Sequence, residues 1–518
     1  MKLNFRPELL KFILKKLNIL RTLTVGLSAF FKVGTVCLGI NCTGYSQDYY
    51  FDYNKEVEAC YQLAIHLRLD ECRVCIKKLK VKQPRNLSIT HIENYIDFFE
   101  IFIKEEKDYF VEAKSRKTKR LALLDNAPKD NPYYKFAKAE IILQWALARL
   151  KFDEKMTAAS EIYEAYRLLE QNNKDFPDFV DHHKSLSVIY ALAESIPGWV
   201  RKLAGIYGSI QLAQSSMEKV LKTAENPNYF FRQEAAAIYA YMLYYQFNQK
   251  DEAITVLDRF AFDHRDNPLA AFVKASLYMK SGKNEECLAV LNERPKGKEF
   301  LEFYYLDLMR GKSLLYKLDP AAIHDLSLFA SEFKGSNYIK EAWQKIAWYR
   351  LLIDDNEKMY QYTIDRAARR GTKIIDEDIQ AESEAKSGKI PNKTLLKARL
   401  LSDGGYCKRA LELLQKEKNN FTAHSTETVE YHYRIGRIYQ QLKNYDSALK
   451  SFELCIAHAR DTKAYFPCAA SLYMGTIYEE KGENQKAKNA YNACLQLNPK
   501  DYKDSLHQKA KSGLQRLN

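Results

Sequence analysis

The feature that most constrains the fold is a pattern of small and aromatic residues that occurs twice near the C-terminal end. The interval from Gly436 to Ala448 is repeated without change from Gly475 to Ala487. Aromatic residues follow each glycine by three positions and each alanine by four, and a proline ends the second copy: Tyr439, Phe452, Tyr478, Tyr491 and Pro499. Small residues let two antiparallel helices approach closely, and aromatic residues wedge between one helix hairpin and the next. The pattern therefore predicts stacked helix hairpins that bury their apolar faces against each other.

This pattern resembles the tetratricopeptide repeat (TPR) motif, most specifically over residues 429–505 and more weakly over 226–518. The resemblance implies an all-α, right-handed solenoid whose first helices line a groove for a peptide or a partner helix. The groove positions of the motif fall on Tyr433, Arg434, Arg437, Gln440, Tyr473, Thr476 and Glu479. TPR proteins that grip a C-terminal carboxylate carry Lys and Asn at such positions. Here Tyr433, Arg437, Leu472 and Thr476 stand there, which argues against that kind of tail binding.

Weaker copies of the pattern lie upstream. The separation between Ala253 and Cys287 equals the period of a TPR. Five weaker copies are assigned to Tyr241, Tyr244, Ala253 and Leu257; Ala275, Tyr278, Cys287 and Leu291; Gly311, Leu314, Pro320 and Ile323; Trp343, Ala347 and Trp348; and Leu400, Gly405, Ala410 and Leu414. The final stretch, Lys503 to Leu517, has the polar character of a helix that caps a solenoid.

These patterns predict five regions: an N-terminal segment (1–47), a divergent helical-repeat domain (48–225), degenerate TPR-like repeats (226–368), an irregular linker (369–392) and C-terminal TPRs with a capping helix (393–518). The linker holds an acidic cluster diluted by lysines, which indicates a solvated face and not a metal site: Asp376, Glu377, Asp378, Glu382 and Glu384. The segment Ile196–Ile210, with Pro197 and Gly198, favours a tight buried turn over a functional hinge or apolar lip.

The N-terminal segment has the order of a secretory signal peptide. Residues 1–47 carry seven Lys or Arg against Glu8 alone, a net charge of +6. An uncharged run from Thr22 to Phe31 follows the basic stretch, and processing near Ser46 or Gln47 is expected. Lys32 interrupts the apolar region, so two alternatives stay open: an anchor that contacts a membrane through residues 1–40, or the first buried helices of the fold. The whole arrangement resembles bacterial envelope TPR proteins and predicts export to the periplasm or envelope.

The charge and the cysteine content point to neither nucleic-acid binding nor a metal site. The net charge of +14 leaves +8 for the chain that follows the N-terminal segment, and no dense basic stripe stands out, so nucleic-acid binding is not favoured. The ten cysteines are interpreted as small buried hydrophobic residues. Cys72 and Cys75 form the only close pair, and no nearby second pair or histidine completes a zinc site.

No sequence motif of an enzyme is present: there is no phosphate-binding loop, nucleophile elbow, zinc-protease helix or calcium loop. The adjacent histidines His182 and His183 make a poor ligand pair, because neighbouring residues on a helix point about 100° apart. Both are expected at the surface. We therefore expect no cofactor and no metal. The sequence predicts a non-catalytic scaffold that binds a protein or peptide partner in the cell envelope. The alternatives are a membrane-anchored assembly or regulatory factor and, less favoured, a basic repeat protein that binds nucleic acid.

Overall fold

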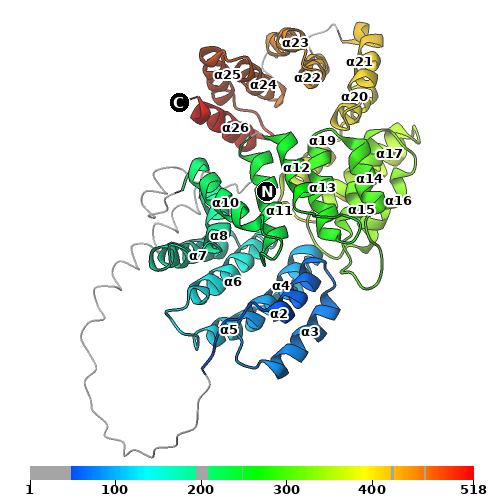
Figure 1. Ribbon diagram of the computed structural model, residues 1–518. Helices are drawn as coiled ribbons and strands as arrows, with labels where there is room; N and C mark the ends of the chain where they lie inside the picture. The colour runs from blue at the N-terminus through cyan, green and yellow to red at the C-terminus, as the bar shows by residue number, and fades with distance from the viewer. Residues whose placement is uncertain (1–47, 194–207, 248, 422–424, 460–462, 518) are drawn as a thin grey trace, which may run out of the picture. The chain divides into compact units, whose positions relative to one another are not determined.

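The computed structural model describes residues 48–193, 208–247, 249–421, 425–459 and 463–517 (Figure 1). Every regular element in these residues is a helix, apart from one isolated bridge between Tyr50 and Asn86. The predicted all-α fold of helix hairpins is confirmed for this part of the chain. The predicted leader 1–47 and most of the segment Ile196–Ile210 lie outside the described residues. The chain divides into two compact units. Unit 1 extends to Ala270 and includes 295–302, and unit 2 comprises 271–294 and 303–517.

Unit 1 is a succession of helices in which neighbours along the chain pack together, with hairpins formed by α2/α3, α6/α7, α8/α10 and α11/α12. Its helices are α2 (Lys55–Ile65), α3 (Leu69–Lys82), α4 (Ser88–Lys104), α5 (Lys107–Leu124), α6 (Pro132–Lys151), α7 (Lys155–Asp175), α8 (His182–Ala193), α10 (Ile210–Ala224), α11 (Arg232–Tyr245) and α12 (Lys250–Arg259). The periodic stretch from Glu56 to Lys78 is broken into α2 and α3 at Leu67, whose backbone is left-handed (φ 59°). This left-handed residue reverses the chain and makes a hairpin from a pattern that reads as one helix.

Apolar packing in unit 1 joins α4, α5 and α6. Ile101, Phe110 and Trp145 are buried in one cluster, and the ring of Phe110 stacks on Phe152 with centroids 4.1 Å apart. Each aromatic side chain of this size removes a large apolar area from water, which is the main stabilising contribution to such a core. The three helices are therefore fixed to each other by shared side chains, as the stacking of repeats requires.

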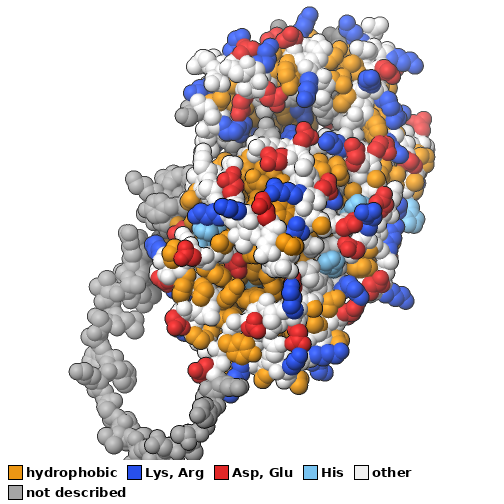
Figure 2. Space-filling model, in the orientation of Figure 1, with side chains coloured by type: hydrophobic (Ala, Val, Ile, Leu, Met, Phe, Trp, Pro, Cys, Tyr) orange, Lys and Arg blue, Asp and Glu red, His pale blue; other side chains and the backbone are white. Residues whose placement is uncertain are grey.

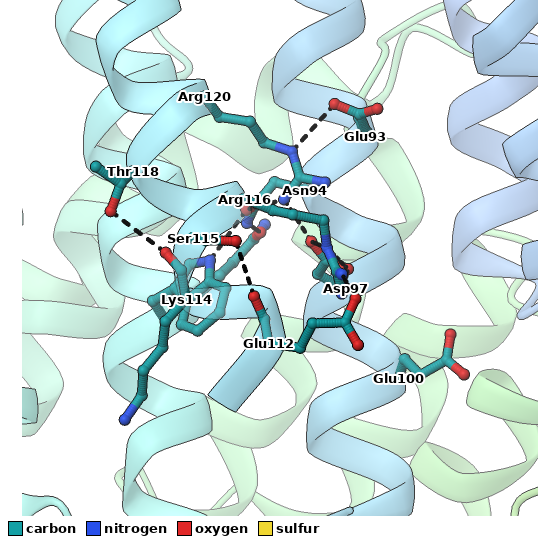
Figure 3. A network of polar contacts seen from close by, with 12 residues as sticks. Glu93, Asn94, Asp97, Glu100, Glu112, Lys114, Ser115, Arg116, Thr118 and Arg120 are labelled. Atoms are coloured by element: carbon teal, nitrogen blue, oxygen red, sulfur yellow. Dashed lines mark hydrogen bonds and ion pairs between the residues drawn. The ribbon is translucent and has the colours of Figure 1, made fainter. Parts of the chain in front are cut away.

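A buried polar network ties α4 to α5 (Figure 3). Asp97 on α4 accepts hydrogen bonds from Arg116 (2.9 Å) and Arg120 (2.6 Å) on α5, and also from the Tyr109 hydroxyl at 2.7 Å. Burial by itself raises the pKa of Asp97, but the hydrogen bonds from Arg116 and the charge of Arg120 outweigh it and lower the pKa. Because its hydrogen-bonding capacity is used within the protein, Asp97 serves to position α5 on α4.

Unit 2 consists of helix hairpins whose first helices also contact each other in the order α20, α22, α24, α26. Its helices are α13 (Pro268–Lys280), which begins in unit 1, α14 (Asn284–Glu293), α15 (Tyr305–Tyr316), α16 (Ala322–Glu332), α17 (Ile339–Leu352), α18 (Glu357–Arg369), α19 (Asp376–Ser387), α20 (Lys393–Asp403), α21 (Cys407–Lys416), the 3₁₀ turn η1 (Lys418–Asn420), α22 (Thr426–Gln441), α23 (Tyr445–His458), α24 (Phe466–Glu480), α25 (Asn484–Gln496) and α26 (Lys503–Arg516). The final helix α26 stands where a capping helix is predicted. Contacts between first helices place their side chains on one continuous face.

The predicted linker 369–392 contains a packed helix. Helix α19 lies against α17 and α18, and its Asp378 accepts hydrogen bonds from the backbone N–H groups of Tyr338 (2.7 Å) and Glu341 (2.9 Å) at the start of α17. Glu382 forms an ion pair with Lys340 at 2.9 Å. Asp378 and Glu382 are buried, so the interpretation of these two residues as a solvated face is wrong. Both carboxylates can be buried because each accepts from groups at the start of α17, where backbone N–H groups have no partner within their own helix.

Two further expectations about single residues need correction. Cys60 and Cys75 form a disulfide that joins α2 to α3, whereas the other six cysteines of the described residues are free and buried as expected. His182 and His183 are buried and not at the surface.

Candidate functional site

The two C-terminal hairpins, α22/α23 and α24/α25, show why glycine is needed in their first helices. A Cβ atom at Gly436 would lie 2.6 Å from the Phe452 ring, and one at Gly475 would lie 2.5 Å from the Tyr491 ring. Ala448 and Ala487 are fully buried, Pro499 is buried, and Tyr439 and Tyr478 are half-buried. The aromatic residues thus pack against the glycine of their own hairpin. Tyr491 also reaches the next helix, as the wedge interpretation requires, because it contacts Gly513 of α26.

The first helices of the hairpins α20/α21 and α22/α23 carry a set of arginines on the face that they share. Arg399 comes from α20, and Arg434 and Arg437 come from α22. Arg434 pairs with Glu430 one turn earlier on its own helix (2.7 Å), and Arg399 lies 3.7 Å from Asp403. Arg437 has no ion pair among the described residues; it donates to Gln440 instead. The three guanidinium groups therefore outnumber the carboxylates that pair with them.

Tyrosine side chains surround these arginines. The guanidinium of Arg437 lies 3.6 Å from the ring centroid of Tyr473 on α24, within the range of a cation–π contact. The ring centroids of Tyr433 and Tyr465 are 6.0 Å apart, and those of Tyr465 and Tyr502 are 4.9 Å apart. We call this set the arginine–tyrosine face: Arg399, Arg434, Arg437, Tyr433, Tyr465, Tyr473 and Tyr502.

The arginines of this face stay charged despite their confined position. Burial alone would lower the pKa of Arg434, but the neighbouring Tyr465 and Glu430 raise it above the ordinary value. The pKa of Arg437 is also raised, by Tyr473 and Tyr433 against the effect of burial. Arginine keeps its proton throughout the physiological range and presents a planar donor fork to carboxylates. The face is thus suited to contact a negatively charged group.

Comparison with known families settles what the C-terminal hairpins are. The sequence profile described as "Tetratricopeptide repeat" matches residues 429–461 and 474–501. The C-terminal hairpins are TPRs. These matches cover the hairpins α22/α23 and α24/α25, so the resemblance drawn from Gly436, Ala448, Gly475 and Ala487 is confirmed. TPRs typically form protein-interaction surfaces, so these two repeats support a role for the chain as a protein-interaction scaffold.

Comparison with solved structures and with curated sequences adds no closer relative. A chain of the "APC/C hetero-tetramer Cut9-Hcn1" is 12% identical, with 90% of this chain and 96% of that chain covered and a TM-score of 0.27. A chain of "Naa15/Naa10 bound to HypK-THB" is 13% identical, with 89% of this chain and 65% of that chain covered and a TM-score of 0.23. TM-scores this low do not establish a common overall arrangement of helices. No curated protein matches the sequence.

The structure brings most of the predicted groove residues of the TPRs together, but not all of them. Arg437, Gln440 and Tyr473 are half-buried on the shared face, whereas Tyr433 and Arg434 are more deeply buried beside them. Thr476 uses its hydroxyl to donate to the carbonyl groups of its own helix α24.

Glu479 is separated from the arginine–tyrosine face by its contacts. It accepts hydrogen bonds from Arg516 of the capping helix at 2.6 Å and 2.8 Å, and from the Tyr491 hydroxyl at 2.5 Å. Glu479 therefore joins α24 to α26. The binding role of the six other groove residues stays a prediction.

Sequence reasoning missed Arg399, Tyr465 and Tyr502. The assigned copy in this region used Gly405, but Gly405 is a turn residue with φ +84°. The interval that separates Gly436 from Ala448, counted back from the buried Ala410, leads to Ala398, which is fully buried in the same cluster as Ala410. Arg399 follows Ala398 as Arg437 follows Gly436. The same interval would therefore have placed Arg399 on the face.

The weaker repeats confirm part of their assigned register. Ala275 and Cys287 are fully buried, and the Cys287 thiol lies 3.4 Å from the carbonyl oxygen of Ala275. A Cβ at Gly311 would lie 2.8 Å from Leu326, so Gly311 is the small residue of α15. Its partner helix begins at Ala322, and Pro320 lies in the turn before it. In this copy Pro320 therefore lies in the loop, and Ile323 lies in the second helix.

Charge on the visible surface is mixed. Figure 2 shows Lys and Arg side chains interspersed with Asp and Glu over the face in view, with no continuous basic stripe. Among the described residues, no group of three or more His, Cys, Asp or Glu is placed to hold a metal ion. Within the same residues, no helix is both long enough and apolar enough to cross a bilayer.

Proposed function

We propose that this TPR protein is a non-catalytic scaffold that binds an acidic segment of a partner protein on its arginine–tyrosine face. The observation that carries the proposal is the gathering of Arg399, Arg434 and Arg437 from two successive first helices. Arg437 has no ion pair among the described residues and stacks on Tyr473. A carboxylate that reaches Arg437 can accept a bidentate hydrogen bond from a guanidinium already held in place, which lowers the entropic cost of binding.

Aromatic neighbours support a peptide as the occupant of this face. Tyr465, Tyr473 and Tyr502 are half-buried, so each presents part of its ring and a polar hydroxyl. Tyrosine gives large contact area at low conformational cost and is enriched at protein interfaces for that reason. Acidic side chains alternating with apolar ones would use both kinds of group on the face.

Fluorescence anisotropy with short labelled peptides tests this function. An acidic peptide that contains aromatic residues should bind, and a basic peptide of the same length should not. Arg437→Gln should weaken binding by roughly tenfold to a hundredfold, since a hydrogen bond to a charged group contributes about 1.5–3 kcal/mol. Lys450→Gln, an exposed residue of the second helix α23, is the matched control and should leave binding unchanged. Equal binding of both peptides, or equal loss in both variants, would refute an acidic partner.

For the location of the protein, we propose export to the periplasm or cell envelope. The disulfide between Cys60 and Cys75 supports it, because disulfides persist in oxidising compartments and are rare in the cytosol. The basic and then apolar order of residues 1–47 supports it as well. Determination of the N-terminus of the native protein tests this: a start near Asp48 in a soluble envelope fraction supports export, and an intact Met1 in the cytosol contradicts it.

A membrane-anchored assembly or regulatory factor is the second candidate. It rests on the same N-terminal stretch, in which the spacing of Leu10, Leu14 and Leu17 is that of one helix face and Lys11 and Lys15 fall outside this spacing. Basic amphipathic helices bind anionic lipid surfaces. Two results would favour this function over the soluble scaffold. The full-length protein would keep Met1 and be found in the membrane fraction, and a variant that lacks residues 1–40 would be found in the soluble fraction.

A further inference from the structure

The last TPR contains two cysteines that face each other. Cys468 lies on α24 and Cys494 lies on α25, and their sulfur atoms are 3.5 Å apart. Both side chains are at most 1% exposed. The sulfur of Cys468 also lies 3.4 Å from the carbonyl oxygen of Cys494. The sulfur atoms of a disulfide bond are about 2.05 Å apart, so these two must approach each other by about 1.5 Å to form one.

The preceding TPR shows that the second cysteine is not a requirement of the repeat. The positions that correspond to Cys468 and Cys494 in that repeat are Val429 and Cys455. Both are buried in the same apolar cluster as Cys468 and Cys494. Valine satisfies the packing at this position of the first helix, so packing alone does not explain the cysteine at 468. The preceding repeat thus supplies an internal control, because its single thiol has no sulfur across the hairpin.

We propose that Cys468 and Cys494 are a modification site at which oxidation forms a disulfide between α24 and α25. The thiolate of Cys468 attacks a disulfide of the oxidant, which is a small-molecule or protein disulfide, and a mixed disulfide forms with release of one thiol. The thiolate of Cys494 then attacks the sulfur of Cys468 and displaces the second thiol. Two thiol protons and two electrons pass to the oxidant, which leaves as a pair of thiols.

The thiolate of a cysteine is the form that attacks a disulfide, and in the closed hairpin the hydrogen bond from Cys494 lowers the pKa of Cys468. Because both sulfur atoms are buried, an oxidant reaches them while the hairpin folds or opens and not in the closed state. The bond is therefore expected to form during folding, as is the bond between Cys60 and Cys75.

A disulfide here acts on the partner-binding surface. Helix α24 carries Tyr473, which holds the guanidinium of Arg437. The bond would link α24 to α25 over a chain separation of 26 residues and restrict the unfolded state of the terminal repeat. Fraying of this end of unit 2, and with it the loss of Tyr473 from the arginine–tyrosine face, becomes rarer when the bond is formed.

Peptide mapping of the full chain refolded with oxidised glutathione tests the proposal. The protein is alkylated under denaturing conditions without reduction and is digested with trypsin. The expected product is peptide 464–481 linked to peptide 489–500, with Cys455 alkylated in peptide 451–460. Alkylation of both Cys468 and Cys494, or a link from either of them to Cys455, overturns the proposal. The link between peptides 56–68 and 74–77 is the positive control for oxidation.

A second measurement separates the bond from misfolding of a variant. Reduction should lower the midpoint of thermal unfolding of α24 and α25 in the wild type and in Cys455→Ser, but not in Cys468→Ser. An equal effect of reduction in all three proteins contradicts the site. The result is independent of the peptide-binding and fractionation experiments, because the oxidant is supplied in solution and no partner is present.

Discussion

The ring of Tyr491 fills the space that a side chain at Gly475 would need. A Cβ atom at position 475 would lie 2.5 Å from the ring, closer than any real carbon contact. The same ring meets Gly513 of α26 from its other side, also at 2.5 Å. One aromatic residue therefore joins three helices of the C-terminal TPRs, and each contact depends on the absence of a side chain.

Substitution of Gly475 by alanine is expected to loosen the last hairpin. The change favours the helix by about 1 kcal/mol, but the overlap with Tyr491 costs about 1–3 kcal/mol and dominates. Hydrogen–deuterium exchange of α24 and α25 measures the net loss. In a Tyr491→Leu background the same substitution should cost much less, because the smaller side chain leaves room for the methyl group. An equal loss in both backgrounds would show that the ring is not the cause.

Removal of a buried cation from unit 1 is expected to destabilise it strongly. The amine of Lys184 is 1% exposed and lies 2.7 Å from both Glu140 and Glu234. Lys184→Met leaves the carboxylates of Glu140 and Glu234 without their cation, which costs about 3–5 kcal/mol in urea denaturation. Burial already raises the pKa of Glu140 to about 7, and the charge of Lys184 opposes that rise. Combining Lys184→Met with Glu140→Gln should recover part of the loss; a further loss would contradict the charge argument.

Asp378 on α19 is expected to hold the start of α17. Its carboxylate accepts from the N–H groups of Tyr338 and Glu341, so Asp378→Ala leaves two donors unsatisfied. The expected loss is about 1–2 kcal/mol, as for other helix N-caps, and tryptophan fluorescence during urea denaturation reports it through Trp348 on α17. Glu377→Ala also removes one carboxylate, from the adjacent residue, and should leave the free energy of unfolding nearly unchanged. Equal losses for the two variants would count against the capping role.

Unit 1 is expected to lose stability in mild acid. Burial lowers the pKa of His91 and His182 to about 3 and that of His183 to about 4. The unfolded chain takes up these protons near pH 6.5 while the folded chain does not. The contribution to stability is therefore complete above about pH 6.5, and it falls by about 1.4 kcal/mol per pH unit for each histidine as the pH drops toward 4.

Unfolding free energies measured between pH 7.5 and 4.5 check this dependence. His182→Gln should give a shallower slope than the wild type, since one proton-binding site of the unfolded chain is lost. His324→Gln, whose imidazole is 76% exposed, should leave the slope unchanged. If the slope is the same in all three proteins, His182 is not a source of the acid sensitivity.

The sequence by itself determined the repeat architecture of the C-terminal part. Gly436, Ala448, Gly475 and Ala487 predict the two hairpins because the spacing of small residues across a hairpin depends on helix pitch and loop length, and both are local properties. The capping helix was predictable from the polar character of the stretch from Lys503 to Leu517. The copy around Gly311 has a longer loop between its helices (317–321, against 442–444 and 481–483 in the C-terminal hairpins), and spacing carries no information about a loop of unexpected length.

Only the tertiary structure decided which polar residues are buried and which cysteines meet. His182, Asp378 and Glu382 are expected at the surface from the sequence, yet each is buried in the fold. Cys75 pairs with Cys60 and not with Cys72, since the hairpin turn at Leu67 sets which faces of α2 and α3 meet. Burial and pairing depend on packing between helices, and a helical period fixes only the face on which a residue lies, not the helix that covers it.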